Sequence, residues 1–145
     1  MKKTLLLVLT TLILSSGISM AAQNIAVVDV TAVVAKSAQV QNLKKEQQTK
    51  MQDLEKWLKN AQADVQKQQT KEGKEKLLKK YNADFAKKKE AIVKDYAAKL
   101  KAVDKSITET ISATAKAKGY NMVISKSVVV FGGDDITADV QKVVK

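Results

Sequence analysis

The sequence lacks the side chains that most enzymes use for chemistry near neutral pH. It contains no histidine and no cysteine, and this removes the commonest acid–base groups, thiol nucleophiles and ligands of zinc or copper. Asp134 and Asp135 form the best remaining cation candidate, but the alternating ligands and final glutamate of an EF-hand loop are absent around them. We interpret this pair as charges at the start of a helix. We therefore expect no enzymatic activity, no cofactor and no metal site.

Lysine is the one charged side chain that the sequence has in excess. All 26 basic residues are lysine, and the formal net charge is +11. Residues 36–118 contain 21 lysines and 11 acidic residues, so the excess positive charge belongs to the middle of the chain. Pairs at i,i+4 spacing, such as Glu55–Lys59 and Glu75–Lys79, neutralise only part of it. Such a field attracts anionic partners in a salt-dependent way. We expect no nucleic acid among them, because arginine, the residue of bidentate base and phosphate contacts, is absent.

The predicted contact residues for such a partner lie on this lysine-rich segment. Trp57, the only tryptophan, lies one position off the apolar seam formed by Leu54 and Leu58. We favour packing across the segment as its role, with an exposed apolar handle for a partner as the alternative. The complete predicted set is Lys56, Trp57, Lys59, Lys67, Lys71, Lys79, Lys80, Lys87, Lys88, Lys89 and Lys94.

Two long helices are predicted to position these side chains. Residues 31–118 contain no proline and a single glycine, Gly73, which lies in the most polar stretch of the segment. A hairpin folded there places residues whose numbers sum to about 146 opposite each other, as in a coiled coil, for example Leu54 and Ile92. Several seam positions are alanine or polar. We therefore expect long, thin arms with weak packing and some flexibility.

The two ends of the chain have a β pattern. Residues 24–30, 121–124 and 128–131 are predicted strands, and residues 134–137 open a final helix. Three strands are too few for an independent sheet, so we expect subunits to share a common body. The predicted fold class is α+β, a small shared β body carrying a long antiparallel coiled-coil hairpin. The predicted oligomer interface comprises Ile25, Val27, Val28, Val30, Val123, Ile124, Val128, Val130, Ile136 and Val140.

The N-terminus has the pattern of a secretory signal peptide. Lys2 and Lys3 precede an apolar run that is too short for a membrane span, and small residues follow it. We expect cleavage after Ala21, or alternatively after Ala22, and export. The predicted organisation is a signal peptide at 1–21, a β-rich oligomerisation body at 22–35 plus 119–145, and a hairpin arm at 36–118 with its tip near Gly73.

The order of these segments resembles the Skp/OmpH family of periplasmic chaperones over the whole mature chain. The residues that carry the resemblance are 135–140 (DITADV) and 25–30 (IAVVDV). The resemblance implies a homotrimer whose three arms enclose a basic cavity and hold unfolded outer-membrane β-barrel proteins without ATP. The family's arms commonly mix lysine and arginine, and this chain has no arginine. No lipopolysaccharide site is therefore carried over.

Three hypotheses of function follow from the sequence. The first is an ATP-independent periplasmic holdase for unfolded outer-membrane proteins. The second is a coiled-coil structural adaptor that docks one folded partner. The third is a polyanion binder of the envelope, whose partner would be an anionic lipid or lipopolysaccharide.

Overall fold

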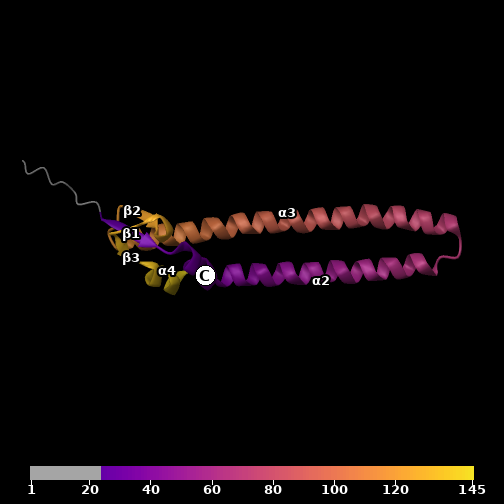
Figure 1. Cartoon of the computed structure of the whole chain (residues 1–145), viewed down its shortest axis with the longest axis horizontal. Helices are drawn as coiled ribbons and strands as arrows, with labels where there is room; N and C mark the ends of the chain where they lie inside the picture. Colours follow the sequence, from indigo (N-terminus) through magenta and orange to yellow (C-terminus); the bar gives the residue numbers. More distant parts are fainter. Residues whose placement is uncertain (1–23) are drawn as a thin grey trace, which may run out of the picture.

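The computed structural model describes residues 24–145, so the predicted signal peptide lies outside the described part of the chain. A small body at one end carries a hairpin of two long helices (Figure 1), and this confirms the predicted α+β class. The elements in chain order are β1 (Ile25–Val28), α1 (Val30–Lys36), α2 (Ala38–Lys67), α3 (Lys71–Ala117), β2 (Met122–Ser125), the 3₁₀ helix η1 (Lys126–Val128), β3 (Asp134–Asp135) and α4 (Thr137–Val143).

Helices α2 and α3 form the arm. At 30 and 47 residues they extend for about 45 Å and 70 Å at 1.5 Å per residue. The chain reverses over residues 68–70, where the hydroxyl of Thr70 caps α3 by accepting a hydrogen bond from the backbone N–H of Gly73 (3.1 Å). Gly73 therefore lies inside the first turn of α3. A Cβ at this position would lie 2.8 Å from the capping hydroxyl, so the glycine makes room for the cap.

The register of the hairpin matches the predicted one. Lys50 of α2 contacts Asp95 of α3 across the seam, and these residue numbers sum to 145. Leu54 and Ile92, which were predicted to face each other, line the same groove between the helices. A reversal near Gly73, together with the apolar spacing, was therefore enough to predict which residues meet across the arm.

A break at Ser37 interrupts what the sequence predicted as one helix from Thr31. The backbone of Ser37 is extended, and its side chain is completely buried. Its hydroxyl donates to the backbone carbonyl of Lys145 (2.5 Å) and accepts from the backbone N–H of Val40 (3.4 Å). The serine thus ends α1, caps α2 and fixes the direction in which the arm leaves the body.

The body contains a three-stranded, fully parallel sheet in the order β2-β1-β3. β1 is central, and its Val27 pairs with Ile124 on one side and Asp135 on the other. The predicted first strand ends earlier than residue 30. Asp29 instead caps α1 by accepting a hydrogen bond from the backbone N–H of Ala32 (2.9 Å).

The predicted strand at residues 121–124 is confirmed as β2, but the one at 128–131 is wrong. Both edges of β1 are already occupied, by β2 and β3, so this apolar run has no edge of the central strand to join. It is followed by Gly132 and Gly133, whose φ angles of 88° and 84° turn the chain back toward the sheet. The chain there approaches Val27 so closely that a Cβ on Gly133 would lie 2.5 Å from its Cγ2.

The core lies between the sheet, α1, α4 and the base of α3. Ser37 is the one buried polar residue in the described part of the chain. The apolar residues of this cluster are Ala26, Val28, Val33, Ile107, Ala115, Ile136 and Val140.

Candidate interaction surface

The ten predicted contact lysines are all exposed on the arm. Lys56 and Lys67 lie 3.8 Å and 3.7 Å from Asp53 and Asp64 one turn earlier on α2. The other eight have no ion-pair partner within residues 24–145, and the expected pairs of Lys59 and Lys79 with glutamates at i−4 do not form. The arm therefore displays positive charge that its own carboxylates leave uncompensated.

Trp57 packs across the arm, in agreement with the favoured interpretation of this residue. Its half-buried indole meets the ring of Tyr81 edge-on, with the centroids 5.6 Å apart at 85°. The ammonium of Lys88 lies 5.4 Å from the centre of the indole ring. The Tyr81 hydroxyl donates to Asp64 across the seam (3.0 Å), and this hydrogen bond raises the pKa of the phenol. One tryptophan thus ties α2 to α3 midway along the arm.

Nearer the body, two carboxylates and two lysines form a closed network that we call the ionic clasp: Glu46, Lys50, Asp95 and Lys99. Lys50 Nζ lies 2.5 Å from Asp95 Oδ2 and 2.7 Å from Glu46 Oε1. Lys99 contacts Glu46 across the seam and lies 3.2 Å from Asp95 Oδ2. Each lysine therefore bridges both helices.

The clasp shifts the pKa of each of its members toward the charged form. The hydrogen bond from Lys50 is the main cause that lowers the pKa of both Glu46 and Asp95, and Lys99 adds to it. Hydrogen bonds to Asp95 and Glu46 raise the pKa of Lys50 and Lys99. The sequence analysis missed the clasp. Its signal was an i,i+4 pair of opposite charges on each helix, at positions that the register brings together.

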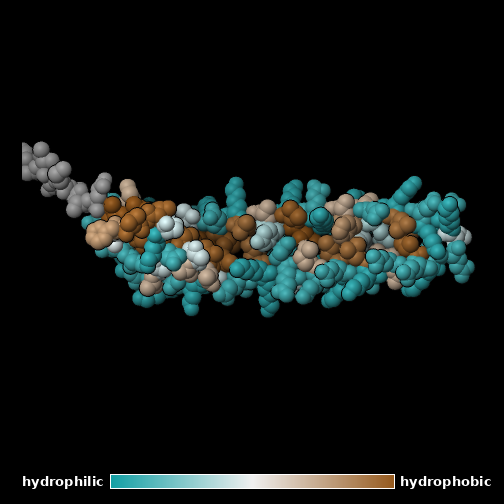
Figure 2. Space-filling model, in the orientation of Figure 1, coloured by the Kyte–Doolittle hydropathy of each residue, from teal (hydrophilic) through white to brown (hydrophobic). Residues whose placement is uncertain are grey.

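Two grooves run along the arm on the tip side of a third, which lies beside the clasp and is lined by Glu46, Lys99 and Ala102, among others. One, of about 310 Å³, is lined by Leu54, Trp57, Lys88 and Ile92, among others. The larger, of about 550 Å³, lies nearer the tip and has a mainly apolar lining of Leu58, Ala61, Val65, Leu78, Tyr81 and Phe85, with amide side chains at its rim. The space-filling view shows hydrophobic side chains along the seam from the body toward the tip, between rows of hydrophilic ones (Figure 2).

The predicted interface residues fall into three groups. Val28, Ile136 and Val140 are buried in the chain's own core, and Val27 is also buried, so they are not available to a second chain. Ile25, Val123 and Ile124 are partly buried. The other three predicted residues, Val30, Val128 and Val130, are exposed, and with Phe131, which was not predicted, they add to the free apolar surface of the body; Val130 and Phe131 are 103% and 98% exposed.

The acidic pair has only part of the role that the sequence suggested: both residues form β3, α4 begins two residues later at Thr137, and only Asp135 contacts its start. Asp135 accepts hydrogen bonds from the backbone N–H and hydroxyl of Thr137 at the start of α4, and pairs with Lys126 at 2.7 Å. These contacts, the one with Lys126 first, hold the pKa of Asp135 far below its ordinary value. Asp134 accepts from Tyr120. Among residues 24–145 no three carboxylates are grouped so as to hold a metal ion.

The fold and this surface define a class of protein: a small α+β body that carries a long helical hairpin with a basic, partly apolar surface. None of the helices in the described region has the length and hydropathy to cross a membrane. The sequence profile of the family described as "Outer membrane protein (OmpH-like)" matches residues 24–144, and the chain belongs to that family. Membership gives it the general role of a periplasmic chaperone of outer-membrane proteins. No curated protein matches the chain.

Proposed function

We propose that this protein is an ATP-independent holdase that binds unfolded outer-membrane β-barrel proteins between its arms and prevents their aggregation. The observation that carries the proposal is the arm itself. Its shorter helix alone is about 45 Å long, and the arm displays lysines without ion-pair partners beside an open apolar groove. Such a surface suits a partner that is long, unstructured and variable better than one compact ligand.

The two kinds of side chain have different tasks in this mechanism. The lysines draw the client in over a distance set by the Debye length, about 8 Å at physiological salt, so salt weakens capture. The segments that will become strands of the barrel carry apolar side chains at alternate positions. In the unfolded client these side chains bind the grooves by the hydrophobic effect. Each contact is small, so the client exchanges between sites and leaves when it folds into the membrane.

We also propose that the working form is a homotrimer that associates through the body. A three-stranded sheet with fully exposed Val130 and Phe131 beside it leaves apolar surface that a neighbouring subunit can cover. Three arms arranged about a common body would surround a cavity with positively charged walls.

An aggregation assay tests the holdase directly. A urea-unfolded outer-membrane barrel protein is diluted into buffer with and without the mature chain, and light scattering is followed at low and at high salt. We expect the chain to suppress scattering, and the suppression to weaken as the salt concentration rises. Undiminished aggregation at both salt concentrations would reject the holdase and favour the structural adaptor.

A further inference from the structure

The side of α3 that points away from α2 carries a row of lysines. Four of them recur at intervals of seven residues, and a further lysine lies four residues beyond each end of this series. Because seven residues make almost two full helical turns, their side chains share one side of the helix over about 44 Å. We call this set the outer lysine row: Lys76, Lys80, Lys87, Lys94, Lys101 and Lys105.

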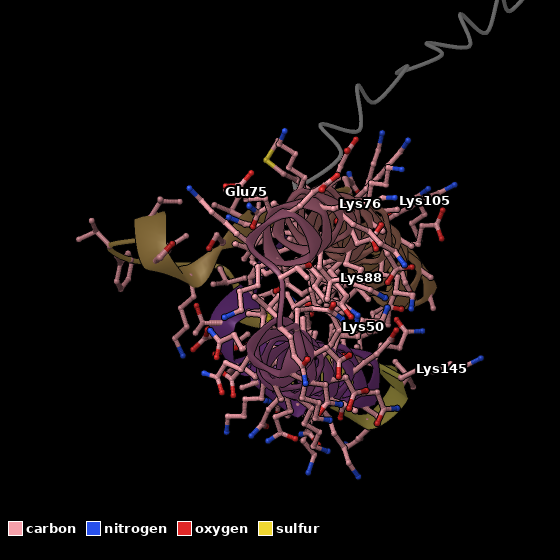
Figure 3. All side chains as sticks on the ribbon, turned by 90° about the vertical axis from the view of Figure 1, so that its right-hand side faces the viewer. Lys50, Glu75, Lys76, Lys88, Lys105 and Lys145 are labelled. Atoms are coloured by element: carbon pink, nitrogen blue, oxygen red, sulfur yellow. The ribbon has the colours of Figure 1, made fainter. Side chains whose placement is uncertain are left out.

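The outer lysine row is separate from the seam of the hairpin. Ile92 lines a groove between the two helices, and Lys94 follows it by two residues. At about 100° per residue, this step turns Lys94 about 200° away from the seam. Viewed from the tip, Lys76 and Lys105 point to the same side of α3, away from α2, although they lie at opposite ends of the row (Figure 3). All six lysines are exposed.

The charge of the row is poorly compensated by the protein itself. Within residues 24–145, Lys105 is the only member that forms an ion pair, at 3.8 Å from Glu109. Two further acids, Glu72 and Glu90, lie one turn from lysines of the row, but neither comes within ion-pair distance of a lysine in this part of the chain. The row therefore leaves five ammonium groups for an external partner.

The stability of the helix does not account for the row. Like charges four residues apart, such as Lys76 and Lys80, destabilise a helix. On the exposed side of α2, the same interval of seven residues gives a mixed series: Lys45, Gln52, Lys59 and Gln66. A solvated side of this arm is thus built with fewer charges on α2 than on α3. The denser row on α3 favours a role in binding an anionic partner.

The side chains beside the row restrict the chemistry of that partner. The positions one turn from the central lysines hold only alanine or an acid: Ala83, Asp84, Glu90, Ala91, Ala97 and Ala98. A folded protein would need an apolar core in the interface, and a helix that lies on a membrane has large apolar side chains beside its lysines. The row offers neither. It suits a partner that is bound through charge.

The aromatic residues of α3 lie elsewhere. Tyr81, Phe85 and Tyr96 are partly buried, and the first two line the larger groove of the seam. The bases of a single-stranded nucleic acid would therefore find no stacking surface beside the row. Lysine binds phosphate as a point charge, without the fixed geometry of arginine. These features together favour a line of phosphate groups that carries neither bases nor lipid tails.

We propose that the outer lysine row binds a flexible linear polyphosphate chain. The chain lies along α3, and its phosphates release bound counterions as they contact successive lysines, so binding depends steeply on salt. The seam and its grooves remain free. This binding function goes beyond the holdase and does not depend on it.

Two variants with equal loss of charge test the assignment. The row variant carries Lys80→Gln, Lys94→Gln and Lys101→Gln, and the control carries Lys44→Gln, Lys45→Gln and Lys59→Gln. All six positions are exposed on the helices of the arm, and none of these lysines forms an ion pair within the described residues. Glutamine is a good helix former, and circular dichroism shows whether both variants keep their helices.

The readout is the dissociation constant for inorganic polyphosphate, measured by titration calorimetry on the mature chain at several salt concentrations. We expect the row variant to bind at least about tenfold more weakly at about 50 mM salt, and the control to stay within about threefold of the unchanged chain. For a single-stranded polyanion each contact contributes about 0.7 to the slope of log K against log salt, so the row variant should lose about 2 from this slope. The slope of the control should not change.

Two other probes identify the source of the phosphate charge. The same titrations use single-stranded DNA with an equal number of phosphates and vesicles that contain an anionic phospholipid. Tighter binding of either probe, lost in the row variant, would assign the row to that partner and overturn the polyphosphate assignment. Equal losses of polyphosphate binding in the row variant and the control would show that only net charge matters. An unchanged chain that did not bind polyphosphate would also overturn the proposal, and the aggregation assay of the holdase would be unaffected by either result.

Discussion

Glu46, Lys50, Asp95 and Lys99 show how few polar contacts hold the two helices in register. Their side chains are between 32% and 42% exposed, so water screens the clasp and it contributes less than a buried network would. Its four members are nevertheless mutually bridged, with each lysine contacting one carboxylate on either helix. We expect the clasp to limit the sliding of α2 against α3 more than it adds to the overall stability.

The clasp predicts a pH dependence of the arm. Since folding lowers the pKa of Glu46 and Asp95, their contribution to stability is present above the unfolded pKa values near 4 and is lost as the pH falls through the folded ones. The variant Glu46→Gln with Asp95→Asn should therefore melt a few degrees lower at pH 7, and its melting temperature should vary less between pH 6 and pH 3. Circular dichroism in the helix band follows the melting of the helices.

Glu90→Gln is the control for this prediction. Glu90 is an exposed acid on the same helix and forms no ion pair within the described residues. A melting temperature that responds to pH equally in the clasp variant and in this control would show that the clasp does not hold the arm.

Ser37 carries a second prediction at the scale of one residue. The buried hydroxyl makes two hydrogen bonds, and Ser37→Ala removes both and leaves the Lys145 carbonyl with the backbone N–H of Gln39 alone. We expect the free energy of unfolding, measured with urea, to fall by about 1–2 kcal/mol. Thr49→Ala removes an exposed hydroxyl in the middle of α2 and should change it by less than about 0.5 kcal/mol. Equal effects of the two substitutions would contradict the assigned role of Ser37.

At the scale of elements, the long helices and their register could be predicted because apolar spacing and helix propensity repeat along the whole arm. The break at Ser37 could not, because the carbonyl that stabilises it belongs to Lys145, 108 residues away. The run at 128–131 has strand composition, but it belongs to the connection between β2 and β3, which occupy both edges of β1, and a sequence does not specify this pairing. The clasp likewise exists only once the helices are aligned.

The ten arm lysines were predicted together as a candidate contact set. That they are exposed follows from their charge. Which of them face a client was not predictable, because the sequence does not say which side of the hairpin stays apolar. The structure adds that division: Met51, Val93 and Leu100 remain exposed on one side, while Trp57 is used to join the helices. Lys88 also differs from its neighbours, because it lies over the indole.

The unpaired lysines of α3 predict a salt-dependent capture of clients. Neutralising Lys87 and Lys89 to glutamine should weaken binding of an unfolded barrel protein severalfold at low salt, and the difference should shrink at high salt. The control is Lys142→Gln with Lys145→Gln, which removes the same charge from the body. Dissociation constants at about 50 mM and about 500 mM salt distinguish an effect of the arm from one of net charge. Equal losses in both variants would mean that only the total charge matters.

For the whole molecule, the decisive surface is the apolar loop of the body. The chain buries Val28, Ile136 and Val140 in its own core, so an assembly has to use what remains exposed, chiefly Val130 and Phe131. This loop lies beside the small sheet, at the base of the arm. Contacts between subunits at the loop would therefore also set the spacing between their arms.

Light scattering of the mature chain should therefore give the mass of a trimer at micromolar concentration, and Val130→Asp should dissociate it, because the new carboxylate would be buried without a partner. Val143→Asp is the matched control, since Val143 is a valine of α4 that is 57% exposed and lies outside the loop. It should leave the trimer intact. A monomeric mass for the unchanged chain would reject the trimer. A trimer that survived Val130→Asp would place the subunit contact elsewhere in the body.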